Sequence, residues 1–154
     1  MHFDANNGNT SSAASPLVGQ PDGWFRIKRR VAWSDADPAG IYTFISVLRY
    51  AEDAEVALFR SLNLLEQLYP RLPRVYVSVQ YRSPAYFDQE IEVAVAIARI
   101  GKSSIHFLFA IIRDNEICAD GQYGVSFLDD NNRPKPISVE IRENLSRYTL
   151  EKLQ

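Results

Sequence analysis

The strongest constraint on the fold is a single long amphipathic helix pattern. Most other segments of the chain alternate apolar and polar residues, as β-strands do. From Phe44 to Leu62, apolar residues recur at steps of three and four, which predicts a helix of roughly five turns with one apolar stripe. The stripe consists of Phe44, Val47, Leu48, Ala51, Ala54, Leu58 and Leu62. The charged residues of the same segment, Arg49, Glu52, Asp53, Glu55 and Arg60, fall mostly off this stripe.

Strand patterns occupy most of the remaining chain. The first is "WFRIKRRVAW", which we expect to bury Phe25, Ile27, Val31 and Trp33 on one face. Four further strands are predicted in "RVYVSVQY", "EIEVAVAIA", "SIHFLFAII" and "ICADGQYGVSFL", and a C-terminal helix in "SVEIRENLSRYTLEKL". One long helix with an antiparallel sheet of about five strands is an α+β layout in which the sheet wraps the helix. We expect a flexible N-terminal tail over residues 1–23 and one domain over 24–154.

The segment from Ile105 to Ile112 is apolar on both of its faces. A single long helix covers only one face of a sheet, so the other face needs a different cover. The simplest candidate is the same sheet of another subunit, and we expect a homodimer or homotetramer.

Composition excludes several classes of protein. The formal net charge of −2 disfavours a nucleic-acid or acidic-membrane binder, and no apolar run approaches the length of a membrane span. The single cysteine, Cys118, precludes an intrachain disulfide framework. The polar N-terminal segment has neither the basic nor the apolar region of a signal peptide, so a cytoplasmic protein is expected. Metal-binding spacing and a Gly-x-Ser-x-Gly motif are absent from the sequence, and no cofactor is predicted.

The stretch "DADPAGI" joins the first strand to the long helix and contains Asp35 and Asp37. Asp, Pro and Gly favour turns, so either carboxylate could close a turn or cap the helix. A positioned carboxylate could equally serve as a nucleophile or a general base. Spacing alone leaves both interpretations open.

Four blocks in this order, "DADPAGI", "LRYAEDAE", "VQYRSPAYFDQEIEV" and "RIGKSS", resemble the 4-hydroxybenzoyl-CoA thioesterase family of hotdog-fold enzymes. The resemblance implies a sheet curled around a central helix, with active sites between paired subunits. It implies that Asp37 is the catalytic carboxylate, acting as nucleophile or general base, while a backbone amide at a helix N-terminus polarises the thioester carbonyl. Asp35 keeps the turn or capping role.

The resemblance also predicts which residues bind the substrate. Gly40 permits close backbone approach, and Ile41, Tyr42, Phe44 and Ser46 belong to the stretch that faces the thioester in the family. Phe44 and Ser46 stand where members often carry a polar aromatic residue and an Asn. Either Tyr42, Thr43 or Ser46 takes over the polar role, or the pocket is more apolar and suits a fatty or polyketide-like acyl chain.

A second group of predicted substrate contacts follows Gly101 at a turn. Lys102 and Ser103 supply a cation and a hydroxyl that could bind the phosphates of coenzyme A. A solvated hairpin turn explains the same residues equally well.

The resulting hypothesis is a thioesterase that hydrolyses an acyl-CoA or an acyl chain on an acyl carrier protein. A hotdog dehydratase is disfavoured because such enzymes usually need a histidine beside the acid, and neither His2 nor His106 is well placed. Cys118 has no basic neighbour and is expected to be inert. A non-catalytic acyl-binding or assembly module remains the rival from a different class.

Overall fold

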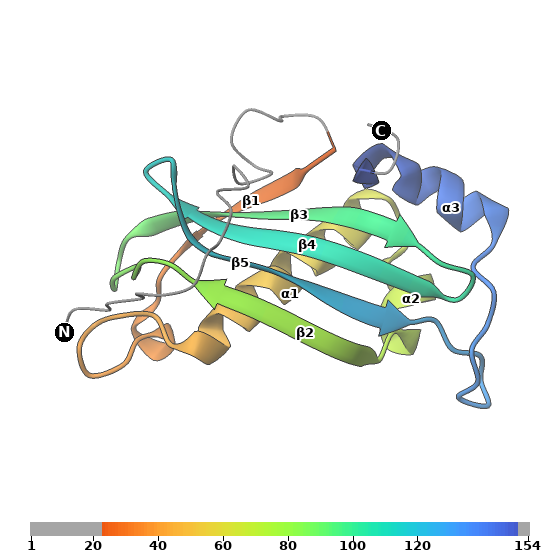
Figure 1. Ribbon diagram of the computed structural model, residues 1–154, viewed down its shortest axis with the longest axis horizontal. Coiled ribbons are helices and arrows are strands. Elements are labelled where there is room, and N and C mark those ends of the chain that lie inside the picture. The colour runs from red at the N-terminus through yellow and green to blue at the C-terminus, as the bar shows by residue number, and fades with distance from the viewer. Residues whose placement is uncertain (1–22, 151–154) are drawn as a thin grey trace, which may run out of the picture.

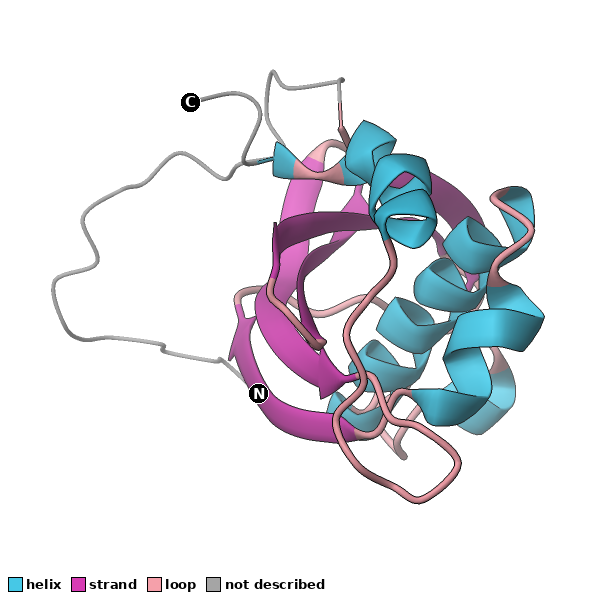
Figure 2. Cartoon of the chain, turned by 90° about the vertical axis from the view of Figure 1, so that its right-hand side faces the viewer, coloured by secondary structure: helices cyan, strands magenta, loops and turns pink. Residues whose placement is uncertain are grey.

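The computed structural model describes residues 23–150 and consists of one antiparallel sheet that curves around a long helix (Figures 1 and 2). In spatial order the five strands are β1, β3, β4, β5 and β2. The strands are β1 Phe25–Arg30, β2 Arg74–Tyr81, β3 Glu90–Ile100, β4 Ser104–Arg113 and β5 Glu116–Ser126, and the helices are α1 Phe44–Ser61, α2 Leu65–Leu68 and α3 Val139–Leu145. The predicted α+β hotdog architecture is confirmed. The predicted tail lies, apart from Gly23, outside the described residues.

Helix α1 packs its apolar stripe against the concave side of the sheet (Figure 2). It begins at Phe44 because the Thr43 side chain accepts a hydrogen bond from the Ser46 amide, a typical N-cap. Val47, Ala54 and Leu58 of the stripe have no exposed surface. Within residues 23–150, no helix is long and apolar enough to cross a membrane.

The two faces of the central strands form two separate apolar clusters. Ile91, Val93, Val95 and Ile97 of β3 face α1, together with alternate residues of β4 such as Phe107. A smaller cluster on the opposite face contains Trp24, Ala94, Ala96 and Ala110, with Leu108 and Ile112 partly buried against it. Both faces of residues 105–112 are therefore apolar except at His106, which lies on the face away from α1.

The two edges of the sheet differ in character. Strand β1, at one edge, carries four cationic residues among six, Arg26, Lys28, Arg29 and Arg30. Strand β2, at the other edge, has Arg74 as its single charged residue, and Val75 and Val77 are 60% and 52% exposed. Charges on an edge strand oppose pairing with another strand, whereas an apolar uncharged edge favours it.

Three expectations about element boundaries were wrong. Strand β1 ends at Arg30, and Trp33 lies in a short 3-10 turn with 75% of its surface exposed, packed edge-on against Phe87. Phe44 is 68% exposed, because it is the first residue of α1 and projects beyond the core. The C-terminal helix is shorter than predicted: α3 ends at Leu145 and a 3-10 turn follows it.

Gly121 of β5 allows β2 to pair closely with the rest of the sheet. A Cβ at this position would lie 2.2 Å from the Ser78 carbonyl oxygen. We therefore expect Gly121→Ala to lower the free energy of unfolding by about 1–3 kcal/mol, as overpacking does. Urea unfolding measures the loss. Gly101→Ala is the matched control, since its Cβ meets the Ser104 hydroxyl, which can rotate away; an equal loss in both variants would contradict the backbone clash.

Candidate active site

The side chain of Asp37 is held in a tight loop between β1 and α1. Its Oδ1 atom accepts hydrogen bonds from the amides of Ala39 (2.8 Å) and Ile41 (3.1 Å). The loop closes through the backbone, because the Gly40 amide donates to the Asp37 carbonyl with Gly40 at a φ of +77°. The bonds recorded within residues 23–150 use Oδ1, which leaves Oδ2 for other contacts. The side chain is thus fixed in direction while remaining exposed in the single chain.

Asp35 has a different role, which is to fasten this loop to α1. Its Oδ2 accepts a hydrogen bond from the Tyr50 hydroxyl (2.9 Å), and its Oδ1 lies 3.3 Å from the Arg49 guanidinium. Its carbonyl accepts from the Thr43 amide (2.8 Å) and from the Ser46 hydroxyl (3.0 Å). Burial, and then the bond to Asp35, raise the pKa of Tyr50 above its usual range. Asp35 is a structural residue, as expected, although its side-chain partners lie on the helix.

The N-terminus of α1, which follows the Asp37 loop in the chain, has unpaired hydrogen-bond donors. The Ser46 amide is used by Thr43, but within the described residues the amides of Phe44 and Ile45 have no acceptor. Unpaired amides in the first turn of a helix attract negative charge.

Asp37 and this helix end line one pocket of about 480 Å³. Its walls are Asp37, Ile41, Tyr42, Thr43, Phe44, Tyr81, Arg82, Ser83 and Pro84. Two hydroxyls fix the walls: Tyr81 donates to the Phe44 carbonyl (2.9 Å), and Tyr42 donates to the Ser83 carbonyl (3.1 Å). Burial raises the pKa of Tyr42 and of Tyr81, so both remain neutral donors at physiological pH.

The structure brings together part of the predicted site. Asp37, Ile41, Tyr42 and Phe44 line this pocket, and Gly40 lies in the loop that shapes it. Ser46 does not face the pocket, because its fully buried side chain bonds to the loop through Thr43 and Asp35.

Lys102 and Ser103 do not line the pocket in the same chain. They form the turn between β3 and β4, whereas the pocket adjoins the bridge between Ile41 and Tyr86 just before β3 begins. The length of β3, about 34 Å at the usual rise per residue, separates the two ends.

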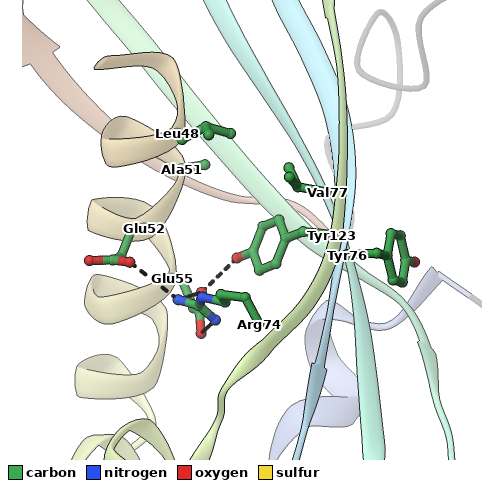
Figure 3. A pocket seen from close by; sticks show the side chains of 8 residues that line it. All are labelled: Leu48, Ala51, Glu52, Glu55, Arg74, Tyr76, Val77 and Tyr123. Carbon is green, nitrogen blue, oxygen red and sulfur yellow. Dashed lines mark hydrogen bonds and ion pairs between the residues drawn. The ribbon is translucent and has the colours of Figure 1, made fainter. Parts of the chain in front are cut away.

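Sequence analysis missed a second pocket of about 230 Å³ between α1 and β2, drawn in Figure 3. It is lined by Leu48, Ala51, Glu52, Glu55, Arg74, Tyr76, Val77 and Tyr123. Glu55 has no exposed surface, contrary to the expectation that it lies off the apolar stripe. The sequence did contain a signal for this burial. Glu55 lies four residues after Ala51 and three before Leu58, and both of these residues belong to the apolar stripe.

Glu55 is held by charge and by hydrogen bonds. The Arg74 guanidinium donates to both carboxylate oxygens (2.9 and 2.7 Å), and the Tyr123 hydroxyl donates to Oε2 (2.7 Å). Burial raises the pKa of Glu55, and the bonds from Arg74 and Tyr123 act in the opposite direction. This cluster is a satisfied buried ion pair.

The other reactive side chains have structural surroundings. His106 lies on the face away from α1, where Tyr76 contacts its Nδ1 (2.8 Å) and Arg99 its Nε2 (3.1 Å). Burial lowers the pKa of His106, and burial raises that of the Cys118 thiol. Among residues 23–150, no group of three or more His, Cys, Asp or Glu side chains could hold a metal ion.

The sequence profile of a family described as the thioesterase-like superfamily matches residues 31–145. A 1,4-dihydroxy-2-naphthoyl-CoA hydrolase from Prochlorococcus marinus (strain NATL1A) is 24% identical over 108 residues, which cover 62% of this chain and 72% of the relative.

Solved structures share the fold. A predicted thioesterase from Bacillus stearothermophilus superposes with a TM-score of 0.74 at 23% identity, covering 82% of this chain and 96% of that one. A thioesterase from Thermus thermophilus, complexed with coenzyme A and Zn, gives a TM-score of 0.73 at 25% identity, covering 82% and 94%.

Proposed function

The chain belongs to the thioesterase-like superfamily, and on that premise we propose that it hydrolyses an acyl-CoA thioester with Asp37 as the reacting carboxylate. One observation carries the proposal: Asp37 lines the same pocket as Phe44, the first residue of α1, whose amide has no acceptor among the described residues. In this proposal the thioester carbonyl oxygen accepts a hydrogen bond from the Phe44 amide, and the carbonyl carbon faces Asp37 across the pocket.

Two forms of the reaction fit this arrangement. In the first, Asp37 attacks the carbonyl carbon, the coenzyme A thiolate leaves, and water then hydrolyses the mixed anhydride. In the second, Asp37 takes a proton from water as the water attacks, and the proton passes to the departing thiolate. In both, negative charge develops on the carbonyl oxygen, and a preorganised helix amide stabilises it.

Coenzyme A is the preferred carrier in this proposal. The relative from Prochlorococcus marinus is named as a CoA-thioester hydrolase, and the Thermus thermophilus thioesterase was solved with coenzyme A. Delivery by an acyl carrier protein stays the alternative. Lys102 and Ser103 remain proposed contacts for the coenzyme A phosphates, and their place at the far turn means that they would serve a pocket of another subunit.

The decisive assay is turnover by the purified full chain of a panel of acyl-CoA thioesters with fatty, β-keto and aromatic acyl groups. Release of free thiol above the spontaneous rate supports the proposal. Tight binding of acyl-CoA without thiol release favours a non-catalytic acyl-binding module instead.

We further propose that the working form is a homodimer joined along the β2 edge. The β2 edge is apolar and nearly uncharged, whereas the β1 edge carries four cations and their acidic partners, and charged side chains disfavour strand pairing. Phe44, Ile45 and Tyr81, beside the Asp37 pocket, are 68%, 57% and 45% exposed in the single chain, and a partner on this edge would cover them.

A lysine in the middle of β2 tests this dimer. Ser78 is exposed in the single chain and lies near the middle of β2. In the proposed dimer the two-fold axis passes through the middle of this strand, so the two copies of Ser78 lie close together. We expect Ser78→Lys to weaken the dimer by more than about tenfold through like-charge repulsion, and to lower activity in parallel. Sedimentation equilibrium measures the dissociation. Ser78→Thr is the neutral control, and full activity of a monomeric Ser78→Lys protein would contradict the proposal.

A further inference from the structure

We propose that Arg74 of the second copy completes each substrate site, and that its guanidinium binds a carbonyl or hydroxyl oxygen of the acyl group. The inference rests on the proposed hydrolysis and on the β2-paired dimer. It assigns a binding role to the pocket between α1 and β2 (Figure 3).

Arg74 is held rigidly by its own chain. Glu55 binds it through two oxygens, Glu52 lies 3.5 Å from it, and its guanidinium carbon sits 5.2 Å from the centre of the Tyr123 ring. A guanidinium has more N–H donors than these contacts use, and the Arg74 side chain keeps 35% of its surface exposed. A preorganised donor of this kind is suited to ligand recognition.

The pocket around Arg74 selects for a particular kind of group. Figure 3 shows Leu48 and Ala51 of α1 facing Val77 of β2 across it, so most of the wall is apolar. The two carboxylates, Glu52 and Glu55, outnumber the one cation, which disfavours a further anion. A neutral oxygen on an otherwise apolar acyl group matches these walls best.

Antiparallel pairing of β2 brings this pocket to the active site of the other copy. In the register that pairs all eight residues of β2 about a two-fold axis, Arg74 of the partner subunit lies near Tyr81, at the end of the strand where its pairing becomes irregular. Tyr81 lines the Asp37 pocket and donates to the Phe44 carbonyl. Within one chain the same cluster is more remote, because the helix from Phe44 to Glu55 spans about 16 Å.

Substrate preference provides the first test. Octanoyl-CoA and β-ketooctanoyl-CoA differ only at C3, where a carbonyl replaces a methylene. We expect the wild type to favour the keto substrate by about 10- to 100-fold in kcat/KM, the usual strength of a hydrogen bond to a charged group. Arg74→Lys, which keeps the charge beside Glu55, should reduce this preference. Glu55→Gln combined with Arg74→Met, which leaves no buried charge, should abolish it. An unchanged preference in both folded variants overturns the assignment.

A mixed dimer provides the second test. It distinguishes an Arg74 that acts across the dimer from one that acts within its own chain. One chain carries Asp37→Asn and the other carries Glu55→Gln with Arg74→Met, on different affinity tags, and the mixed dimer is purified after co-expression. If Arg74 acts across the dimer, one of the two sites is intact and about half of the wild-type activity on β-ketooctanoyl-CoA returns. If Arg74 acts within its own chain, both sites are damaged, and the activity of the mixed dimer does not exceed that of the Glu55→Gln and Arg74→Met parent. Wild-type protein that hydrolyses no thioester of the panel would instead refute the proposed function itself.

Discussion

Asp37→Asn is expected to lower kcat/KM for acyl-CoA hydrolysis by about 10²- to 10⁴-fold, the contribution of a positioned carboxylate. Asparagine keeps an oxygen that can accept from the Ala39 and Ile41 amides, so the loop is retained while the charge is lost. Initial rates of thiol release on the best substrate of the panel measure the effect, and binding of a non-hydrolysable acyl-CoA shows whether the pocket is intact.

Asp35→Asn is the matched control, with the same chemical change two residues earlier. The Asp35 carboxylate contacts Tyr50 and Arg49, away from the walls of the Asp37 pocket. We expect a loss of stability and a much smaller loss of kcat/KM. If Asp37→Asn retains wild-type turnover, Asp37 is not the reacting group, whatever the effect at Asp35.

Arg74→Met is expected to lower the free energy of unfolding by about 3 kcal/mol at neutral pH, because it strands a buried carboxylate. The value is at the lower end of the range for a broken buried ion pair, since Arg74 is itself 35% exposed in its side chain. Glu55 has no exposed surface through which water could replace the lost partner, and Tyr123 alone remains to bond it.

The same variant should show a characteristic pH dependence. Without Arg74, the pKa of Glu55 in the folded protein is raised further, so the fold gains stability from the protonated form. That gain is fully present below the unfolded pKa of about 4.5 and is lost as the pH rises through the folded pKa. The stability difference from the wild type should therefore shrink as the pH falls toward 4.5. Chemical unfolding of both proteins across this range measures it.

Adding Glu55→Gln to Arg74→Met is the control for these two results. The double variant has no buried charge to strand, so it should recover most of the stability at neutral pH. A double variant as unstable as Arg74→Met would mean that packing of the arginine stem, and not the ion pair, carries the stability.

The parts of the fold with a regular period could be predicted from the sequence. The stripe from Val47 to Leu58 and the alternation of Ile91, Val93, Val95 and Ile97 correspond to buried faces, because each pattern matches the geometry of its element. The prediction that Trp33 lies on the buried face of β1 was wrong, because the apolar alternation in the sequence continues beyond the residue at which the backbone leaves the strand. Period alone does not encode where a strand leaves the sheet.

The candidate site was predictable only where its residues are neighbours in sequence. Asp37, Ile41, Tyr42 and Phe44 belong to one loop and one helix start, so a motif identifies them together. The cluster of Glu55, Arg74 and Tyr123 joins a helix to two strands, and no spacing in the sequence connects them. The distance between Lys102 and Asp37 in one chain likewise depends on the direction of β3, which a turn motif does not specify.

The unlike edges of the sheet also bear on how far assembly can proceed. In the proposed dimer the β2 edge of each copy is covered by the other. Both outer edges of the combined sheet are then β1 strands rich in arginine. In the proposed dimer, the charged side chains on these borders would disfavour pairing with the edge strand of a third chain. Pairing along β2 would in that way protect the sheet against the open-ended strand pairing that leads to fibres.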